Sequence, residues 1–388
     1  MNSLDDQPVP NSYEHTELIL AEPIAPQPSI AHRIFFGPYG LRAGWSLLIF
    51  IAMVAATGAL IFAAVHVYHL HHPAAEAARK AADAAKKTAD VIEDKPANSL
   101  FSHGIPLAIL LFFSWVMSRI ERRSFGAYGF AISRRRYVAD LFKGLLSGLC
   151  AMSLLIGILA ATHFLVFTGL AISGIAALNS PLLWLASFSL VGIAEEYFFR
   201  GYLQFTLARG LSGILPRGNP YRNMLGFWLA TILLSLLFFA AHTDNSGESP
   251  LGLFFVFLAG MVFAYSLWRT GSLWWAIGAH ITWDWAQAAI YGTAGSGLIA
   301  KGRLLNSHPT GNILISGGAT GPEGSLFAFL VLALLVLAIR FTLPKREGPS
   351  LFADRAPRHQ PNRPRKNCSS HDLLPFRREL PITSKSLR

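Results

Sequence analysis

The sequence predicts an all-α polytopic membrane protein with about eight transmembrane helices. Three observations support this prediction: 52% of the 388 residues are hydrophobic, only 14% are charged, and several apolar runs approach 20 residues. A helix of about 20 apolar residues spans the hydrocarbon core of a bilayer. The eight expected helices lie at residues 43–67, 104–120, 141–168, 181–207, 224–242, 251–268, 272–292 and 324–343.

The eight segments differ in length and surroundings. The first follows an interfacial stretch, RIFFGPYGLR, and the second precedes an arginine-rich loop. The segments 141–168 and 181–207 are longer than about 20 residues, so we expect them to tilt or to extend beyond the lipid. The remaining segments have about the length that a single crossing requires.

The positive charges of the loops predict the orientation. The loop RIERRSFGAYGFAISRRR carries six arginines, and the loop after the fourth helix contributes Arg209, Arg217 and Arg222. Connections 169–180 and 243–250 hold no lysine or arginine. Because cytoplasmic loops carry the excess of basic residues, we expect both termini in the cytoplasm. The expected location is the plasma membrane, the inner membrane of a bacterium.

The chain divides into a membrane domain, residues 41–343, and two polar tails. Residues 1–40 are expected to be a flexible cytoplasmic tail, and the segment 74–95, rich in alanine and in charges of both signs, an external helix. The tail 344–388 holds eleven Lys and Arg against four Asp and Glu, so we expect it to be disordered and to bind anionic lipid. The net charge of +11 therefore indicates topology and lipid, and no nucleic-acid partner is expected.

Few ionisable residues remain within the apolar segments. His163 is an isolated one on the third segment, and four histidines at 66, 69, 71 and 72 lie at a membrane boundary, where we expect them to be interfacial. The others fall on the fourth, fifth and seventh segments: Glu195, Glu196, Arg200, His242, His280 and Asp284. Charged side chains at membrane depth are costly and by default mark a functional site.

Helical spacing predicts how the first three of these residues divide their roles. Glu196 and Arg200 are four residues apart, with the acid nearer the N-terminus, which favours an ion pair. Glu195 is rotated by about 100° and does not share that partner. We therefore expect Glu195 to face a cavity, where desolvation would favour its use as a general base.

The same spacing recurs on the other two helices. His280 and Asp284 share one face, so the carboxyl can orient the imidazole, and Phe238 shares a face with His242. A residue count along the helices places Glu195 and His280 at similar depth but His242 at the outer end of its helix. Polar residues can simply bridge membrane helices, yet six on three helices favour a site.

The ordered motifs resemble those of the CPBP family, also called the Abi family of intramembrane proteases, which contains CAAX prenyl endopeptidases and bacteriocin-processing or immunity proteins. The motif residues stand in EEYFFRGYLQ, LLSLLFFAAH and WRTGSLWWAIGAHITWDW, and the resemblance covers roughly residues 180–292. It implies a glutamic-type catalytic core with a conical active-site cavity between the fourth, fifth and seventh helices. The expected activity is hydrolysis of peptide bonds in membrane-embedded or lipidated protein and peptide substrates.

The resemblance also implies roles for the motif residues. Glu195, aided by His242, would activate a water molecule, and His280 with residue 284 would stabilise the oxyanion. Glu196 and Arg200 would support the first glutamate. The family commonly has asparagine at the last position. An ionised carboxylate cannot donate a hydrogen bond, so Asp284 would have to be protonated or to act by orienting His280.

Two further readings remain open at this stage. Glu195, His242 and His280 would also form a metalloendopeptidase-like zinc triad, but the chain lacks an HExxH spacing at these residues, and we expect no cofactor. A non-catalytic membrane scaffold or immunity protein of the same fold is one alternative function. A proton-coupled transporter that uses the same carboxylates and histidines as a relay is the other.

Overall fold

A computed structural model describes residues 29–37, 40–88, 92–130, 134–216, 218–295 and 298–345. Most of the two expected tails, residues 1–28 and 346–388, lies outside this description. The described chain is mostly helical, which confirms the predicted fold class of a polytopic all-α membrane protein.

Six helical segments are long and apolar enough to cross a membrane within the described residues. The elements that form them are α2 (Ala43–His71), α4 (Pro96–Ile120), α5 (Arg134–Ala161), α6 (Ala176–Glu195) continued by η2 (Glu196–Leu203) and α7 (Gln204–Ile214), α8 (Arg222–Ala241) and α9 (Pro250–Thr270).

The seventh and eighth expected helices are present but shorter. The seventh consists of α10 (Trp274–Asp284), which continues as the π-helix η3 (Trp285–Ile290), and the eighth is α12 (Leu326–Thr342). All eight apolar segments therefore contain a helix, and six of them have the length of a full crossing. The protein is accordingly an integral membrane protein.

The helix α10 lies in the interior of the bundle. Nine of its eleven residues are buried, and Trp275 is completely buried. Its closest neighbour is α5, where a Cβ atom at Gly144 would lie 2.2 Å from Trp275 O and one at Gly148 would lie 2.1 Å from Ala279 O. Because only glycine permits this approach, the two helices pack backbone to backbone and hold His280 in a fixed place.

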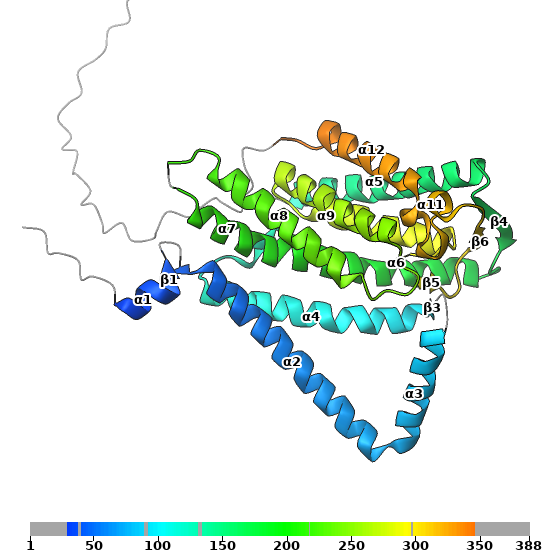
Figure 1. Ribbon diagram of the computed structural model, residues 1–388, viewed down its shortest axis with the longest axis horizontal. Coiled ribbons are helices and arrows are strands. Elements are labelled where there is room, and N and C mark those ends of the chain that lie inside the picture. The colour runs from blue at the N-terminus through cyan, green and yellow to red at the C-terminus, as the bar shows by residue number, and fades with distance from the viewer. Residues whose placement is uncertain are drawn as a thin grey trace, which may run out of the picture. The chain divides into compact units, whose positions relative to one another are not determined.

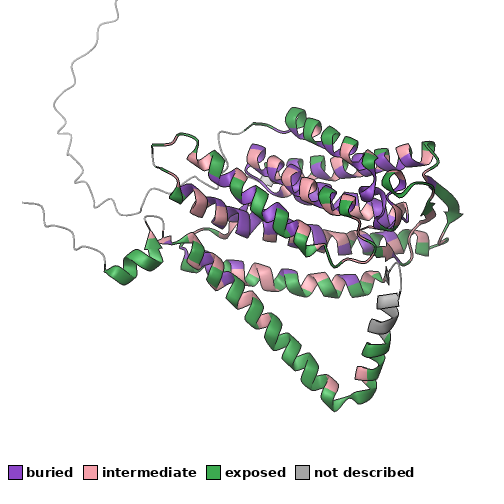
Figure 2. Cartoon of the chain, viewed as in Figure 1, coloured by how far each residue is buried: buried purple, intermediate pink, exposed green. Residues whose placement is uncertain are grey.

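The helices α2 and α3 (Pro73–Thr88) differ from this packed bundle. Figure 1 shows α2 diverging from α4, with α3 leading back toward the start of α4. Figure 2 colours most of α2 as exposed, and only Ser46 and Phe50 of this helix are buried. The apolar side chains of α2, such as Phe62 with 74% exposure, therefore have the lipid as their surroundings.

The predicted external helix 74–95 is shorter than expected. It ends at Thr88, and Ile92–Asp94 form strand β3, which pairs in parallel with β5 (Leu298–Ala300). A strand of three residues has no sequence pattern of its own, and its pairing with a segment 200 residues away depends on tertiary structure.

The third expected helix, 141–168, also ends early. The helix stops at Ala161, and β4 (Leu165–Leu170) pairs antiparallel with β6 (Leu305–Pro309). His163 consequently lies in an exposed turn with φ 61° rather than within a helix. A short apolar run such as LVFTGL is compatible with both a strand and a helix, which explains the wrong boundary.

The remaining elements are short connectors. They are α1 (Ile30–Phe35), the pair β1 (Phe36–Gly37) and β2 (Gly40–Leu41), η1 (Phe125–Tyr128), α11 (Ile313–Ser316), η4 (Gly318–Thr320) and η5 (Pro322–Gly324).

The arginine-rich loop after α4 contacts Arg209, which lies within α7 rather than in the expected loop. Glu121 is 4% exposed, and its Oε2 lies 3.3 Å from Arg123 Nε and 3.6 Å from Arg209 Nη2. The hydroxyl of Tyr202 lies 3.5 Å from Glu121 Oε1. These contacts place the loop after α4 and the end of α7 on the same side of the bundle, as the charge pattern predicts.

Candidate active site

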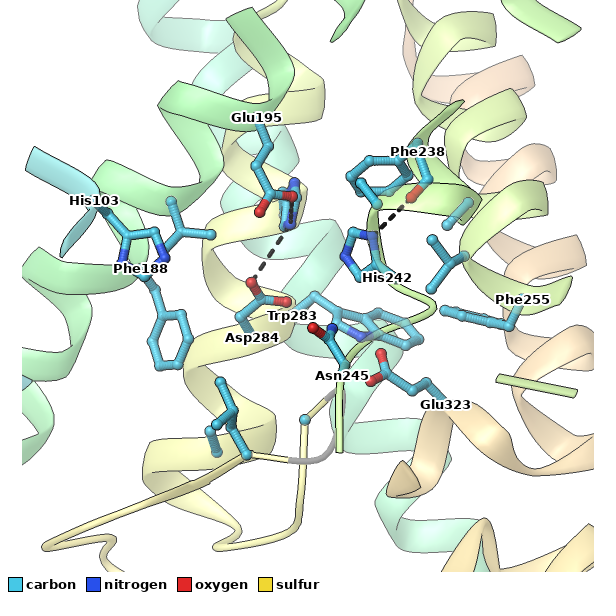
Figure 3. Close-up of a pocket in the computed structure, with 18 of the residues that line it drawn as sticks. His103, Phe188, Glu195, Phe238, His242, Asn245, Phe255, Trp283, Asp284 and Glu323 are labelled. Atoms are coloured by element: carbon cyan, nitrogen blue, oxygen red, sulfur yellow. Dashed lines mark hydrogen bonds and ion pairs between the residues drawn. The ribbon is translucent and has the colours of Figure 1, made fainter. Parts of the chain in front are cut away.

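A cavity of about 350 Å³ opens among the helices that carry the sequence motifs. Its lining includes five of the seven predicted site residues, which are Glu195, Phe238, His242, His280 and Asp284. The other two, Glu196 and Arg200, lie buried behind the lining. Figure 3 shows the labelled side chains, which come from α4, α6, α8, α9, α10 and two loop segments.

Glu196 and Arg200 form the predicted ion pair. Arg200 Nη1 donates to Glu196 Oε1 at 2.9 Å, and both residues are at most 3% exposed. The guanidinium also lies over the ring of Phe238, 4.3 Å from its centroid, a cation–π contact. Gly260 leaves room for it, because a Cβ atom there would lie 3.0 Å from Arg200 Nη2. The charges are thus paired in an otherwise apolar region.

The ion pair contacts His280 directly. His280 Nδ1 lies 2.9 Å from Glu196 Oε1, and the ring stacks on Phe263 at 5.5 Å. Because an ionised carboxylate only accepts, the proton belongs on Nδ1. Glu196 and Arg200 therefore fix the orientation of His280, and their support of Glu195 stays a prediction.

The other nitrogen of His280 faces two carboxylates. His280 Nε2 lies 3.4 Å from Asp284 Oδ2 and 3.7 Å from Glu195 Oε2. A neutral ring with its proton on Nδ1 would direct a lone pair at both acids. A proton shared among Nε2, Asp284 and Glu195 therefore stabilises this arrangement. Figure 3 marks the His280–Asp284 contact with a dashed line.

His242 lies at the end of α8, as the residue count predicts, and still reaches the cavity. Its Nδ1 lies 2.8 Å from Phe238 O, and its ring makes an edge contact with Phe238 at 4.5 Å. A carbonyl oxygen only accepts, so Nδ1 carries the proton and a neutral His242 presents Nε2 as an acceptor. The cavity, with space for several water molecules, connects His242 with Glu195.

Two of the three helices that carry the motifs, α6 and α10, change their hydrogen-bond pattern at the site. Glu196–Leu203 and Trp285–Ile290 are π-helical, beginning directly after Glu195 and Asp284. π-helical turns often occur at functional sites, where they shift the direction of the side chains that follow. No pattern in the sequence predicts them.

Sequence reasoning missed several residues of the lining. They are Asp94 from β3, Ser99 and His103 from α4, Asn245 from the loop after α8, and Glu323 from η5. The sequence signals for them are weak: Asn245 stands three residues after His242, and Glu323 is a single acid within GPEGS. Their assembly depends on how the loops fold.

The zinc alternative does not fit the described side chains. No group of three or more His, Cys, Asp or Glu residues there has the arrangement that holds a metal ion, and this includes Glu195, His242 and His280. The four histidines 66, 69, 71 and 72 likewise form no such group. We therefore derive no step through a metal.

Comparison with known proteins supports the resemblance. Residues 176–286 match the family model described as type II CAAX prenyl endopeptidase Rce1-like. The matched segment contains all seven predicted site residues, from Glu195 to Asp284. Neither the curated proteins nor the solved structures gave a match. The resemblance predicted from the motifs is thus confirmed over this segment, and it supports a CAAX-type intramembrane protease in general.

Proposed function

We propose that the protein is an intramembrane endopeptidase that hydrolyses peptide bonds of membrane-embedded or lipidated substrates. The single observation that supports this most strongly is the cavity in which Glu195, His242 and His280 converge inside a segment that matches an endopeptidase family. Peptide hydrolysis requires a base, a water molecule and groups that stabilise the developing oxyanion. The cavity offers space and side chains for each.

In the proposed reaction, Glu195 accepts a proton from water, and the oxygen attacks the carbonyl carbon of the scissile bond. His242 Nε2 accepts the second water hydrogen and so orients the nucleophile. The proton then passes to the leaving amine as the C–N bond breaks. Glu195 is suited to the role because it is the least buried acid of its cluster, with 29% of its side chain exposed.

We assign the Glu196–Arg200 pair a positioning role. It fixes His280 Nδ1, and so directs Nε2 toward the two carboxylates at 3.4 and 3.7 Å. An ionised carboxylate cannot donate a hydrogen bond to an oxyanion. We propose that Asp284 acts instead by sharing the proton of His280 Nε2.

We further propose that the protein lies in a plasma membrane with both termini in the cytoplasm, on the charge pattern of the loops. The contacts of Arg123 and Arg209 with Glu121 support a common side for the loop after α4 and for α7. Labelling of single cysteines with an impermeant reagent tests this. Residue 219 should be protected in intact cells, and residue 244 should be labelled.

The function is tested by comparing new protein N-termini in host membranes that carry wild type, Glu195→Ala or His280→Ala. Glu76→Ala and His163→Ala are matched controls, because both residues lie outside the cavity. We expect a set of N-termini that the controls retain and both site variants lose. Identical profiles in cells that express every variant equally would contradict the proposal. Retention of the set after strong chelation would exclude a metal requirement.

A further inference from the structure

The cavity holds many hydrogen-bond acceptors and few donors. Three histidines line it, and each has Nδ1 at an acceptor: His103 at Ser99 O (2.8 Å), His242 at Phe238 O (2.8 Å) and His280 at Glu196 Oε1 (2.9 Å). The neutral rings of His103 and His242 therefore present an accepting Nε2, and the proton of His280 Nε2 is already held between two carboxylates. The acids in the lining, Asp94, Glu195, Asp284 and Glu323, add further acceptors.

An oxyanion requires the opposite chemistry. Hydrolysis converts a carbonyl oxygen into a negatively charged one, which N–H donors aimed at it stabilise. A proton on His280 Nε2 already lies between Glu195 and Asp284. The indole of Trp184 donates to Lys301 O at 3.1 Å, and the hydroxyls of Ser99 and Ser187 are bonded to each other.

Two cavity-lining side chains with N–H groups remain among the described residues, Asn245 and Trp283. Trp283 is stacked on Phe255, with ring centroids 5.5 Å apart, which fixes the plane of its indole. Asn245 is half-buried, and Figure 3 shows its side chain pointing into the cavity near Asp284, on the side where His242 and Glu323 lie. The amide of Asn245 carries two N–H groups and no charge.

The loop that carries Asn245 is held at several points. Asn245 N donates to His242 O at 3.2 Å, and Thr320 Oγ1 donates to Gly247 O at 2.9 Å. The loop ends at Ser249, whose hydroxyl caps α9 by accepting from Gly252 N at 3.1 Å. A fixed loop keeps a donor in place without a cost of reorganisation during the reaction.

From these observations we infer that Asn245 is a further catalytic residue, whose side-chain amide donates to the oxyanion of the tetrahedral intermediate. The inference rests on the proposed endopeptidase function and deepens it. As water oxygen bonds to the carbonyl carbon, the C=O electron pair moves onto oxygen, and Asn245 Nδ2–H stabilises the charge. When the C–N bond breaks, the pair returns and the amine takes the proton from Glu195.

The test uses full-length protein in proteoliposomes and a synthetic peptide that spans one cleavage site from the Glu195-dependent set. We expect Asn245→Ala and the isosteric Asn245→Asp to lower kcat about 100-fold or more, the usual effect of removing one oxyanion donor. KM should change little, because the interaction forms only in the transition state. Asp244→Ala is the matched control, since Asp244 is exposed in the same loop and should leave kcat unchanged.

Each other outcome has a defined meaning. If Asn245→Ala keeps kcat within about threefold of wild type, the inference is wrong, and a loss of kcat in Trp283→Phe would then assign the donor to the indole. Tryptophan fluorescence reports the folded fraction, to which every rate is referred. If wild type and Glu195→Gln cleave equally, the proposed function itself is wrong. If cleavage depends on Glu195 but Asn245→Ala retains it, only the role of Asn245 is wrong.

Discussion

The protein contains two buried glutamates with arginine partners, and a comparison of them shows how a functional site differs from a structural ion cluster. Glu196 is completely buried and bonds Arg200, and Glu121 is 4% exposed and lies near Arg123 and Arg209. The Glu196 cluster continues through His280 to a cavity, whereas Glu121 is absent from the lining of that cavity and is covered by Tyr202. Both clusters are thus buried and charged, and only the Glu196 cluster has access to the cavity.

Replacing the acid that faces the cavity should give the largest effect. Glu195→Gln removes the proposed base while keeping the shape of the side chain, so we expect cleavage to fall about 10²- to 10⁴-fold. The unfolding midpoint should remain near that of wild type, because this side chain is 29% exposed. Cleavage rates and tryptophan fluorescence on one preparation measure both. A normal rate would show that the cavity acid is not the base.

Breaking the buried pair behind the cavity should cost both activity and stability. Arg200→Met leaves Glu196 as an uncompensated buried charge, for which about 3–5 kcal/mol of unfolding free energy is typical. Glu196, which accepts from His280 Nδ1, then loses the partner that holds it in place, so the cleavage rate per folded molecule should also fall. Reversible unfolding in detergent checks the first effect. Unchanged stability would mean that Glu196 is protonated or hydrated in the protein.

The corresponding change in the other cluster should separate stability from activity. Glu121→Gln leaves Arg123 and Arg209 without their carboxylate, and we expect a loss of about 1–3 kcal/mol. The rate per folded molecule should equal that of wild type, because Glu121 does not line the cavity. A lower cleavage rate in fully folded Glu121→Gln would show that the Glu121 cluster also contributes to activity.

The smallest effect is expected for an exposed pair. Hydrogen bonds from Arg79 at 2.8 and 2.9 Å lower the pKa of Glu76 on α3 to about 2. Since this pKa lies below the usual value near 4.3, the stabilisation is present above that value and is lost as the pH falls through about 2. Glu76→Gln should match wild type in activity and unfolding midpoint at pH 7, because solvent screens exposed pairs. A large shift of the midpoint would indicate that α3 is packed against another surface.

Much of this architecture follows from the sequence, for identifiable reasons. Hydropathy located all eight helical segments, and the four-residue spacing predicted the contacts Glu196–Arg200, His280–Asp284 and Phe238–His242. Such spacing works because it reports local helical geometry.

What the sequence did not predict depends on tertiary packing. A π-helix changes each hydrogen bond by one residue and needs no special composition, so η2 and η3 could not be foreseen. The contact of Glu196 with His280 requires α6 and α10 to pack together. Asn245 and Glu323 come from loops whose fold brings them to the cavity.

The most direct test of the central claim is cleavage of one identified peptide by purified wild type, Glu195→Gln and Glu121→Gln in proteoliposomes, with each rate referred to folded protein. We predict that Glu195→Gln loses at least about 100-fold in rate while Glu121→Gln cleaves as wild type does. Equal rates for wild type and Glu195→Gln, or equal losses in both variants, would contradict it.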